Sequence, residues 1–135
     1  MEVKLMMNER DVKGVYVPVV TPFLENGKLD EVSFHHYIGK ILDQDIDGII
    51  INGTTGESPT VSFDEVTALV KMTKEQMKVR KKLPILIGTG TNNTASTVIL
   101  TEMAGEIGAD GSLVVVPYYS RPSQEGICAH FKKVA

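Results

Sequence analysis

The chain has 135 residues, of which 42% are hydrophobic and 23% are charged, and it contains no tryptophan. This length and composition are typical of one globular domain or of a piece of a larger one, and they argue against a disordered chain. The formal net charge of −3 leaves no excess of basic residues, so nucleic acid and anionic membrane surfaces are not expected as partners.

The N-terminal residues and the single cysteine predict where the protein resides. Charged side chains interrupt every apolar run in residues 1–11, and no stretch is long enough to span a bilayer. Cys128 has no second cysteine with which to form a disulfide. We therefore predict a cytoplasmic protein in a reducing compartment, with Cys128 packed as a small buried side chain and not acting as a nucleophile.

Two strand-then-helix units are predicted in the first part of the chain. Residues 14–21 form a valine-rich run that is typical of a strand buried on both faces. Asp30 can cap the helix that follows, whose apolar residues recur at helical spacing. A second strand is predicted over residues 46–51. Ser62 and Glu65 then have the spacing of a capping box, which predicts the start of a second helix.

Two further units follow in the second part. The run at residues 85–88 predicts a third strand, and Gly108 is expected to end the helix after it. The apolar face of that helix is predicted to hold Ala95, Ile99, Met103 and Ile107. Residues 113–116 are predicted as the fourth strand, and residues 124–135 as a fourth helix that the end of the sequence cuts short.

The order of these elements predicts an α/β fold with parallel strands. The strands begin roughly thirty to forty residues apart, which fits right-handed βαβ units. A doubly wound sheet would normally carry a glycine-rich phosphate loop after its first strand, and residues 21–23 (TPF) do not resemble one. We therefore predict a (β/α)8 TIM barrel, of which residues 1–135 cover about the first four βα units without an internal domain boundary.

Half of a barrel would have an incomplete surface. Four strands leave two unpaired parallel edges and an uncovered apolar interior, so such a segment is expected to need the other half or a partner. In a barrel, the loops that follow the strands gather at one end and build the functional site. The four loops of this chain are therefore expected to face one end.

The strongest candidate for a binding element is the GTTGES loop, residues 53–58. Its glycines permit a sharp turn that exposes consecutive N–H groups, and Thr54 and Thr55 add two hydroxyls. Such a loop suits the oxygen atoms of a carboxylate or phosphate, which predicts a small anionic ligand. A loop that only turns the chain and caps the next helix is the alternative.

Tyr118 and Tyr119 are the next candidates, because a hydroxyl at the end of a strand can relay a proton. Packing at an interface is the alternative for both rings. His35 and His36 are adjacent on a predicted helix, so their side chains diverge, and His130 is distant in sequence. We therefore predict no metal site and no cofactor.

Four segments in order resemble the dihydrodipicolinate synthase and N-acetylneuraminate lyase family. They are residues 14–23 (GVYVPVVTPF), 53–58 (GTTGES), 88–92 (GTGTN) and 117–126 (PYYSRPSQEG). The resemblance covers the chain from Gly14 onward and corresponds to the N-terminal half of a family member. The second and fourth segments are more similar to the dihydrodipicolinate synthase branch than to the sialic acid lyases.

The resemblance implies a (β/α)8 enzyme, commonly a homotetramer, that joins pyruvate to aspartate semialdehyde through a lysine Schiff base on the route to diaminopimelate and lysine. The iminium is an electron sink that eases loss of a proton from the pyruvate methyl group. By the same resemblance, Thr54 would relay protons and Thr55 would hold the pyruvate carboxylate. Tyr119 would complete the relay by reaching into the site of a neighbouring subunit.

The chain departs from the family pattern because the Schiff-base lysine, and the tyrosine and arginine that act with it, lie on later strands in the family. The chain alone is therefore expected to be inactive. Lys132 and Lys133 belong to a helix after the fourth strand and are not expected to replace that lysine. Two alternatives stay open, namely another pyruvate-dependent class I aldolase of the family and a noncatalytic half-barrel that associates with itself.

Overall fold

A computed structural model describes residues 12–135, so the prediction made from residues 1–11 lies outside the described part. Strands and helices alternate four times, as predicted. In chain order they are β1 (Tyr16–Pro18), α1 (Glu31–Leu42), β2 (Gly48–Ile51), α2 (Phe63–Lys78), β3 (Ile85–Gly88), α3 (Thr94–Glu106), β4 (Gly111–Leu113) and α4 (Gln124–Val134). Among the helices of residues 12–135, none has both the length and the apolar character that crossing a membrane would require.

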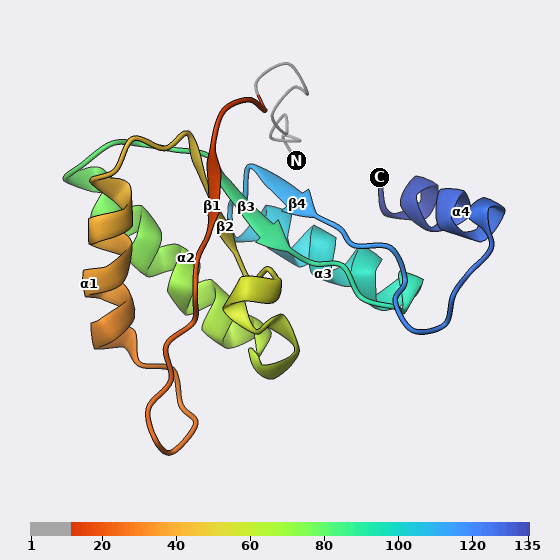
Figure 1. Ribbon diagram of the computed structural model, residues 1–135, viewed down its shortest axis with the longest axis horizontal. Coiled ribbons are helices and arrows are strands. Elements are labelled where there is room, and N and C mark those ends of the chain that lie inside the picture. The colour runs from red at the N-terminus through yellow and green to blue at the C-terminus, as the bar shows by residue number, and fades with distance from the viewer. Residues whose placement is uncertain (1–11) are drawn as a thin grey trace.

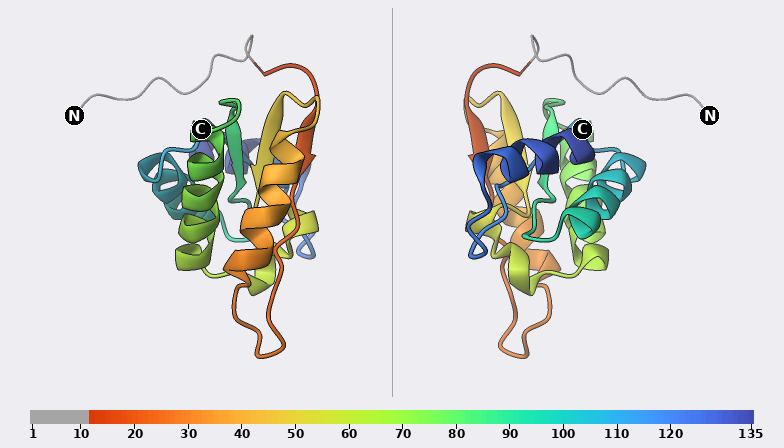
Figure 2. Two further views of the ribbon diagram at one scale, coloured as in Figure 1. Left: turned by 90° about the vertical axis from the view of Figure 1, so that its left-hand side faces the viewer. Right: turned by 90° about the vertical axis from the view of Figure 1, so that its right-hand side faces the viewer.

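The four strands form one parallel sheet in the order β1-β2-β3-β4. Within the described residues, β1 and β4 each pair with a single strand, so one edge of each is open. Figure 1 and Figure 2 show α1 and α2 packed side by side against the sheet, while α4 stands apart from the sheet and contacts α3. The predicted α/β order with parallel strands is confirmed.

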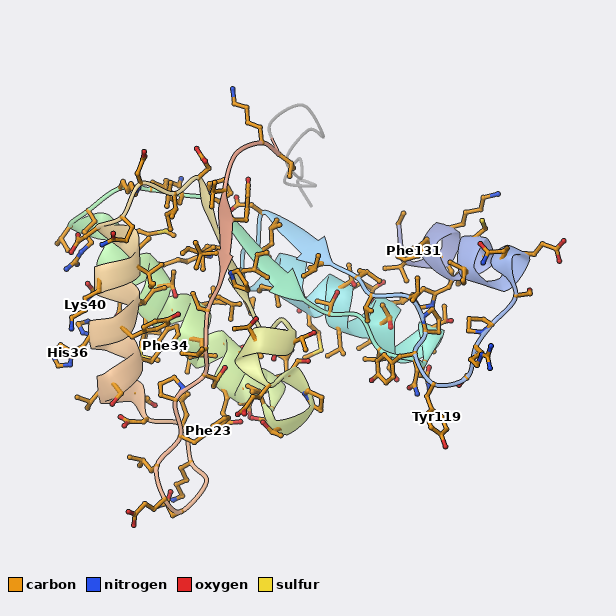
Figure 3. The ribbon with its side chains drawn as sticks, in the orientation of Figure 1. Phe23, Phe34, His36, Lys40, Tyr119 and Phe131 are labelled. Carbon is orange, nitrogen blue, oxygen red and sulfur yellow. The ribbon has the colours of Figure 1, made fainter. Side chains whose placement is uncertain are left out.

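The hydrophobic core lies between the sheet and the helices α1 and α2. Alternate residues of a strand point to the same face, and the four isoleucines that face the helices are all buried. They are Ile49, Ile51, Ile85 and Ile87. Phe34 of α1 and Leu69 of α2 pack against them without exposure to solvent, and Figure 3 shows Phe34 directed inward from α1. Burial of such side chains is the main source of stability.

Both predicted helix caps are present. The carboxylate of Asp30 accepts a hydrogen bond from the backbone N–H of Ser33, at 3.0 Å. At the start of α2 the capping box is complete, because the Glu65 N–H donates to the Ser62 hydroxyl and the Ser62 N–H donates to the Glu65 carboxylate. These contacts satisfy amides that the first turn of a helix leaves unpaired.

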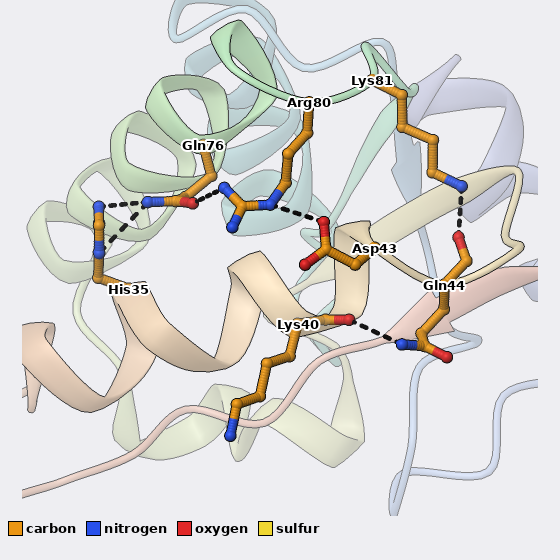
Figure 4. Close-up of polar contacts among 7 residues, drawn as sticks. All are labelled: His35, Lys40, Asp43, Gln44, Gln76, Arg80 and Lys81. Carbon is orange, nitrogen blue, oxygen red and sulfur yellow. Dashed lines mark hydrogen bonds and ion pairs between the residues drawn. The ribbon is translucent and has the colours of Figure 1, made fainter.

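Polar side chains join α1 to α2 outside the core. Figure 4 shows the Gln76 amide between the His35 ring and the Arg80 guanidinium, which in turn pairs with Asp43 at 2.9 Å. His36 points away from this group toward solvent, as Figure 3 shows. The predicted divergence of the two adjacent histidines is wrong, because their rings lie edge to face with centroids 6.2 Å apart. Among residues 12–135 no group of side chains is arranged to hold a metal ion.

The predicted position of the fourth strand is wrong. The strand occupies residues 111–113 and not 113–116, because Asp110 fixes its start. The Asp110 carboxylate accepts the N–H of Ile85, and the Asp110 N–H donates to the Ile85 carbonyl. These two bonds lie at the start of the pairing of β3 with β4, just before Leu86 pairs with Gly111. The valine run of residues 114–116 therefore extends beyond the sheet.

The predicted apolar face of α3 is wrong in part, and the expected burial of Cys128 is wrong. Met103 and Ile107 are partly buried, and Ile107 packs against the core, but Ala95 is exposed. Ile99 is 55% exposed, whereas the buried residues of α3 are Thr97 and Ala104. The Thr97 hydroxyl donates to the Asn93 carbonyl at 3.0 Å and accepts the N–H of Thr91, so hydrogen bonding to the preceding loop turns this polar side inward. Cys128 is exposed on α4.

The capping box predicts how stability depends on pH. Donation from the backbone and hydroxyl of Ser62 lowers the pKa of Glu65 from its ordinary value of 4.5. A lowered pKa in the folded state stabilises the fold above pH 4.5, and this contribution is lost as the pH falls through the folded pKa. Glu65→Gln is therefore expected to lower the urea midpoint of unfolding at pH 7. Below pH 4.5 the midpoint of this variant should decrease less steeply with falling pH than that of the parent chain.

Glu102→Gln on the exposed side of α3 is the control for the Glu65 experiment. Its urea midpoints at pH 7 and below pH 4.5 should both match those of the parent chain. An unchanged acid profile in Glu65→Gln would contradict the assignment of this stabilisation to the capping box.

The open edges predict self-association of the separate 135-residue polypeptide. Val15, Val20, Val115 and Val116 flank the edge strands and are all exposed. Exposed apolar residues beside unpaired strands favour association, so the polypeptide should elute above the mass of one chain in size-exclusion chromatography with light scattering. Val115→Lys should reduce this association.

Val79→Lys is the matched control, because Val79 is 77% exposed but lies at the end of α2, away from the sheet edges. It should leave the association unchanged. A monomeric parent polypeptide, or equal effects of the two lysine substitutions, would contradict the role of the open edges.

Candidate functional site

The GTTGES loop (residues 53–58) is a compact turn at the end of β2. Thr54–Gly56 form a single 3₁₀ turn, in which the Gly56 N–H donates to the Gly53 carbonyl at 3.0 Å. Asn52 before the turn and Glu57 after it adopt left-handed backbone conformations, with φ of 60° and 57°. A second 3₁₀ turn, Ser58–Thr60, leads to the cap of α2. The chain therefore reverses sharply between β2 and α2 and presents residues 54 and 55 at the bend.

Two neighbouring strands anchor this loop. Beyond β1, the buried Thr21 hydroxyl donates to the Gly56 carbonyl at 2.7 Å. A Cβ at position 56 would lie 3.1 Å from the Val19 carbonyl oxygen, so glycine allows the close approach. From the other side, the Asn52 side-chain amide donates to the carbonyl of Gly88, the last residue of β3, at 2.9 Å. The loop is thus fixed to the ends of both strands that flank β2.

Thr54 and Thr55 can donate hydrogen bonds to an anion. Both residues are exposed, and the structure records no hydrogen bond from either hydroxyl within residues 12–135. Their backbone amides open the 3₁₀ turn, where N–H groups have no partner inside the turn. Two hydroxyls and two amides on consecutive residues form a set of donors that suits the two oxygens of a carboxylate.

Two hollows lie beside the loop. The one with a volume of about 280 Å³ is named the larger hollow. The strand ends and loops that line it supply Asn52, Gly53, Thr54, Ser58, Gly88, Gly90, Leu113, Val114 and Val115. The loops after β2, β3 and β4 therefore share one end of the sheet, as expected. Thr55 does not line this hollow, although it adjoins Thr54 in the same turn.

Tyr119 lies apart from the two threonines. It is 96% exposed, has a left-handed φ of 67°, and points away from the body of the chain in Figure 3. Tyr118 instead lines a second hollow of about 120 Å³, together with Ser58 and Phe63. Thr54 and Thr55 therefore share one turn, and Tyr119 lies outside it, exposed to solvent.

The sequence analysis missed two residues that hold the loop, Asn52 and Thr21. Asn52 could have been found as a polar residue directly after the isoleucine run of β2. Thr21 could have been found in the same way, since it follows the valine run of the first strand. Their hydrogen bonds connect positions 36 and 35 residues apart, which local spacing does not reveal.

Comparison with known proteins shows the family of the chain. Residues 11–135 match the family model described as the dihydrodipicolinate synthetase family. The 4-hydroxy-tetrahydrodipicolinate synthase of Ralstonia nicotianae is 49% identical over 124 residues, which are 92% of this chain and 42% of that protein. The enzyme of the same name from Coxiella burnetii is 43% identical over 90% of this chain and 42% of its own length. The chain thus spans about two fifths of these relatives.

Solved structures give the same result. The dihydrodipicolinate synthase of Thermotoga maritima is 44% identical, with a TM-score of 0.83 over 90% of this chain and 40% of its own. The synthase of Acinetobacter baumannii in complex with pyruvate is 37% identical, with a TM-score of 0.84 over 91% of this chain and 42% of its own. These structural relatives are TIM-barrel proteins, so the parallel sheet corresponds to about four βα units of a barrel. From the family match and these shared backbones we conclude that the chain belongs to the dihydrodipicolinate synthetase family of enzymes.

Proposed function

We propose that this chain forms the pyruvate-carboxylate site and part of the proton relay of a 4-hydroxy-tetrahydrodipicolinate synthase, which condenses pyruvate with aspartate semialdehyde. The observation that carries the proposal is the GTTGES loop, whose consecutive donors at Thr54 and Thr55 are exposed and fixed from two sides. The names of the relatives support the substrates. The cytoplasmic location is part of the same proposal.

Each threonine has a distinct proposed role. Thr55 binds the pyruvate carboxylate with its hydroxyl and its backbone N–H, since hydrogen bonds to a charged acceptor are stronger than those to a neutral one. Binding places the keto carbon of pyruvate where a lysine amine can form a Schiff base. The Thr54 hydroxyl, which lines the larger hollow, passes protons to and from the reacting carbon and nitrogen.

Tyr119 completes the relay from a neighbouring copy of the protein. Its exposure and its distance from the chain's own core support this assignment, because a tyrosine ring usually buries apolar surface. The proposal requires a homo-oligomer, either a dimer or a tetramer, in the active enzyme.

The nucleophile of the reaction is proposed to lie outside these 135 residues. In the family the Schiff-base lysine is carried by a later strand, and Lys132 and Lys133 are in α4, after β4. The separate 135-residue polypeptide is therefore expected to be inactive. Borohydride reduction in the presence of pyruvate tests this directly, because it traps a lysine Schiff base as a stable adduct.

Mass spectrometry after borohydride treatment should show no pyruvate adduct on the separate polypeptide. The protein translated from the complete reading frame that contains the chain should show one adduct and should consume aspartate semialdehyde. An adduct on the 135-residue polypeptide would overturn the placement of the nucleophile.

Another pyruvate-dependent aldolase of the family is the second candidate. The loop described here recognises the pyruvate part alone, and the larger hollow contains no charged side chain that would select the aldehyde. A panel of aldehydes offered with pyruvate decides between the two. Preference for any aldehyde over aspartate semialdehyde would replace the first proposal by this one.

Thr55→Val in the protein from the complete reading frame tests the carboxylate site. Valine keeps the shape of threonine and removes the hydroxyl donor. Loss of a hydrogen bond to a charged group costs about 1.5–3 kcal/mol, so the KM for pyruvate should rise by roughly tenfold to a hundredfold. Thr55→Ser should restore most of the affinity. A KM within twofold of the parent value in Thr55→Val would contradict the role of this hydroxyl.

Tyr119→Phe tests the relay. Removal of a positioned proton donor is expected to lower kcat by about a hundredfold or more with little change in the KM for pyruvate. Tyr118→Phe is the matched control, since Tyr118 faces the smaller hollow, and its kcat should stay near that of the parent. Equal losses in the two variants would argue for packing and against a relay.

A further inference from the structure

Asn52 occupies a conformation that most side chains avoid. It is the first residue after β2, and its φ of 60° lies in the left-handed region, which asparagine tolerates better than other residues with a Cβ apart from aspartate. At this residue the backbone leaves the sheet and enters the GTTGES loop. The sequence leading to it, GIII, favours a continued strand, so something other than local preference must hold the turn.

The Asn52 side chain holds this turn in place. Ile51 pairs with Ile87 as the last residues in register between β2 and β3, which places Asn52 beside Gly88. The Asn52 amide donates to the Gly88 carbonyl at 2.9 Å and so continues the contact between the strands where the backbone ladder stops. A Cβ at position 88 would overlap the carbonyl oxygen of Asn52, so this approach requires glycine.

The orientation of this amide is determined by its surroundings. The nitrogen faces the Gly88 carbonyl, and the oxygen Oδ1 is buried without a hydrogen-bond partner in the described part of the chain. A flipped amide would place Oδ1 against the Gly88 carbonyl, where two acceptors repel each other. Asn52 lines both the larger and the smaller hollow, so it forms part of the wall between them.

We propose that Asn52 is a positioning residue for pyruvate binding, and this rests on the proposed function of the GTTGES loop. By joining the end of β2 to the end of β3, it fixes where Thr54 and Thr55 present their donors relative to the loop that begins at Gly88. Thr21 holds the other side of the same loop through Gly56. Loss of the Asn52 contact leaves the loop held from one side only.

Hydrogen exchange on the protein from the complete reading frame tests the contact independently of activity. In Asn52→Gly the left-handed turn stays accessible, since glycine adopts it freely, and only the side-chain contact is lost. Exchange of the buried Gly56 amide, which donates to the Gly53 carbonyl, should become about tenfold faster, while exchange within α2 should stay within about twofold.

Glu57→Gly is the matched control for the exchange experiment. Glu57 is in the same loop with a φ of 57°, and within residues 12–135 its side chain makes no recorded hydrogen bond. It should raise exchange of the Gly56 amide by less than about threefold. Equal acceleration in both glycine variants, or none in Asn52→Gly, would overturn the proposed contact.

Kinetics on the protein from the complete reading frame test the positioning role. Asn52→Asp keeps the shape of the side chain, but its carboxylate cannot donate to Gly88 and adds a negative charge near the anion. The KM for pyruvate should rise about tenfold at pH 8 with a smaller change in kcat, and it should fall again as the pH is lowered and the carboxyl is protonated.

Each result decides one part of the proposal. An unchanged KM in Asn52→Asp together with faster loop exchange in Asn52→Gly would keep the contact and reject its role in pyruvate binding. Absence of a pyruvate adduct in the parent enzyme after borohydride would instead reject the proposed function of the loop, and the exchange data would still decide whether Asn52 fixes it.

Discussion

The close pairing of β2 with β3 is the constraint on which the rest of the structure depends. Its helix-facing isoleucines form the centre of the core, and α1 and α2 pack over them. The same pairing ends where Gly88 lacks a side chain and Asn52 can reach its carbonyl. Burial on one face of the sheet and the geometry of the GTTGES loop at its end therefore have a common origin, and a change in this pairing would alter both.

Much of the fold could be predicted from the sequence because its signals are local. The capping box of Ser62 and Glu65 is a matter of spacing along the chain, and the structure has it. The fourth strand was misplaced because hydrophobicity favoured the valine run, whereas the hydrogen bonds between Asp110 and Ile85 set the register. The face of α3 was predicted only in part for a similar reason, since Thr97 is buried through hydrogen bonds and not through apolar character.

The residues of the candidate site also differ in whether local sequence signals or distant contacts determine them. Thr54 and Thr55 could be singled out because glycine and threonine in a short turn have a direct chemical meaning, and their roles stay proposals. Asn52 and Thr21 stand out in the sequence only as polar residues after apolar runs, and their contacts could not be predicted, since each acts on a backbone carbonyl more than thirty residues away in sequence. Tyr119 could be singled out as a tyrosine at the end of a strand, but its 96% exposure in the structure could not be predicted from the sequence.

The anchoring of one loop by two different strands has a consequence for misfolding. One anchor is the Thr21 side chain that follows β1 and the other is the backbone carbonyl of Gly88 in β3, so a shift of either strand by one residue would move its anchor away from the loop. A sheet with β1 out of register would present the wrong group to Gly56, and one with β3 out of register would remove Gly88 from Asn52. Misregistered chains would thus lose the geometry of the loop even where their cores remained hydrophobic.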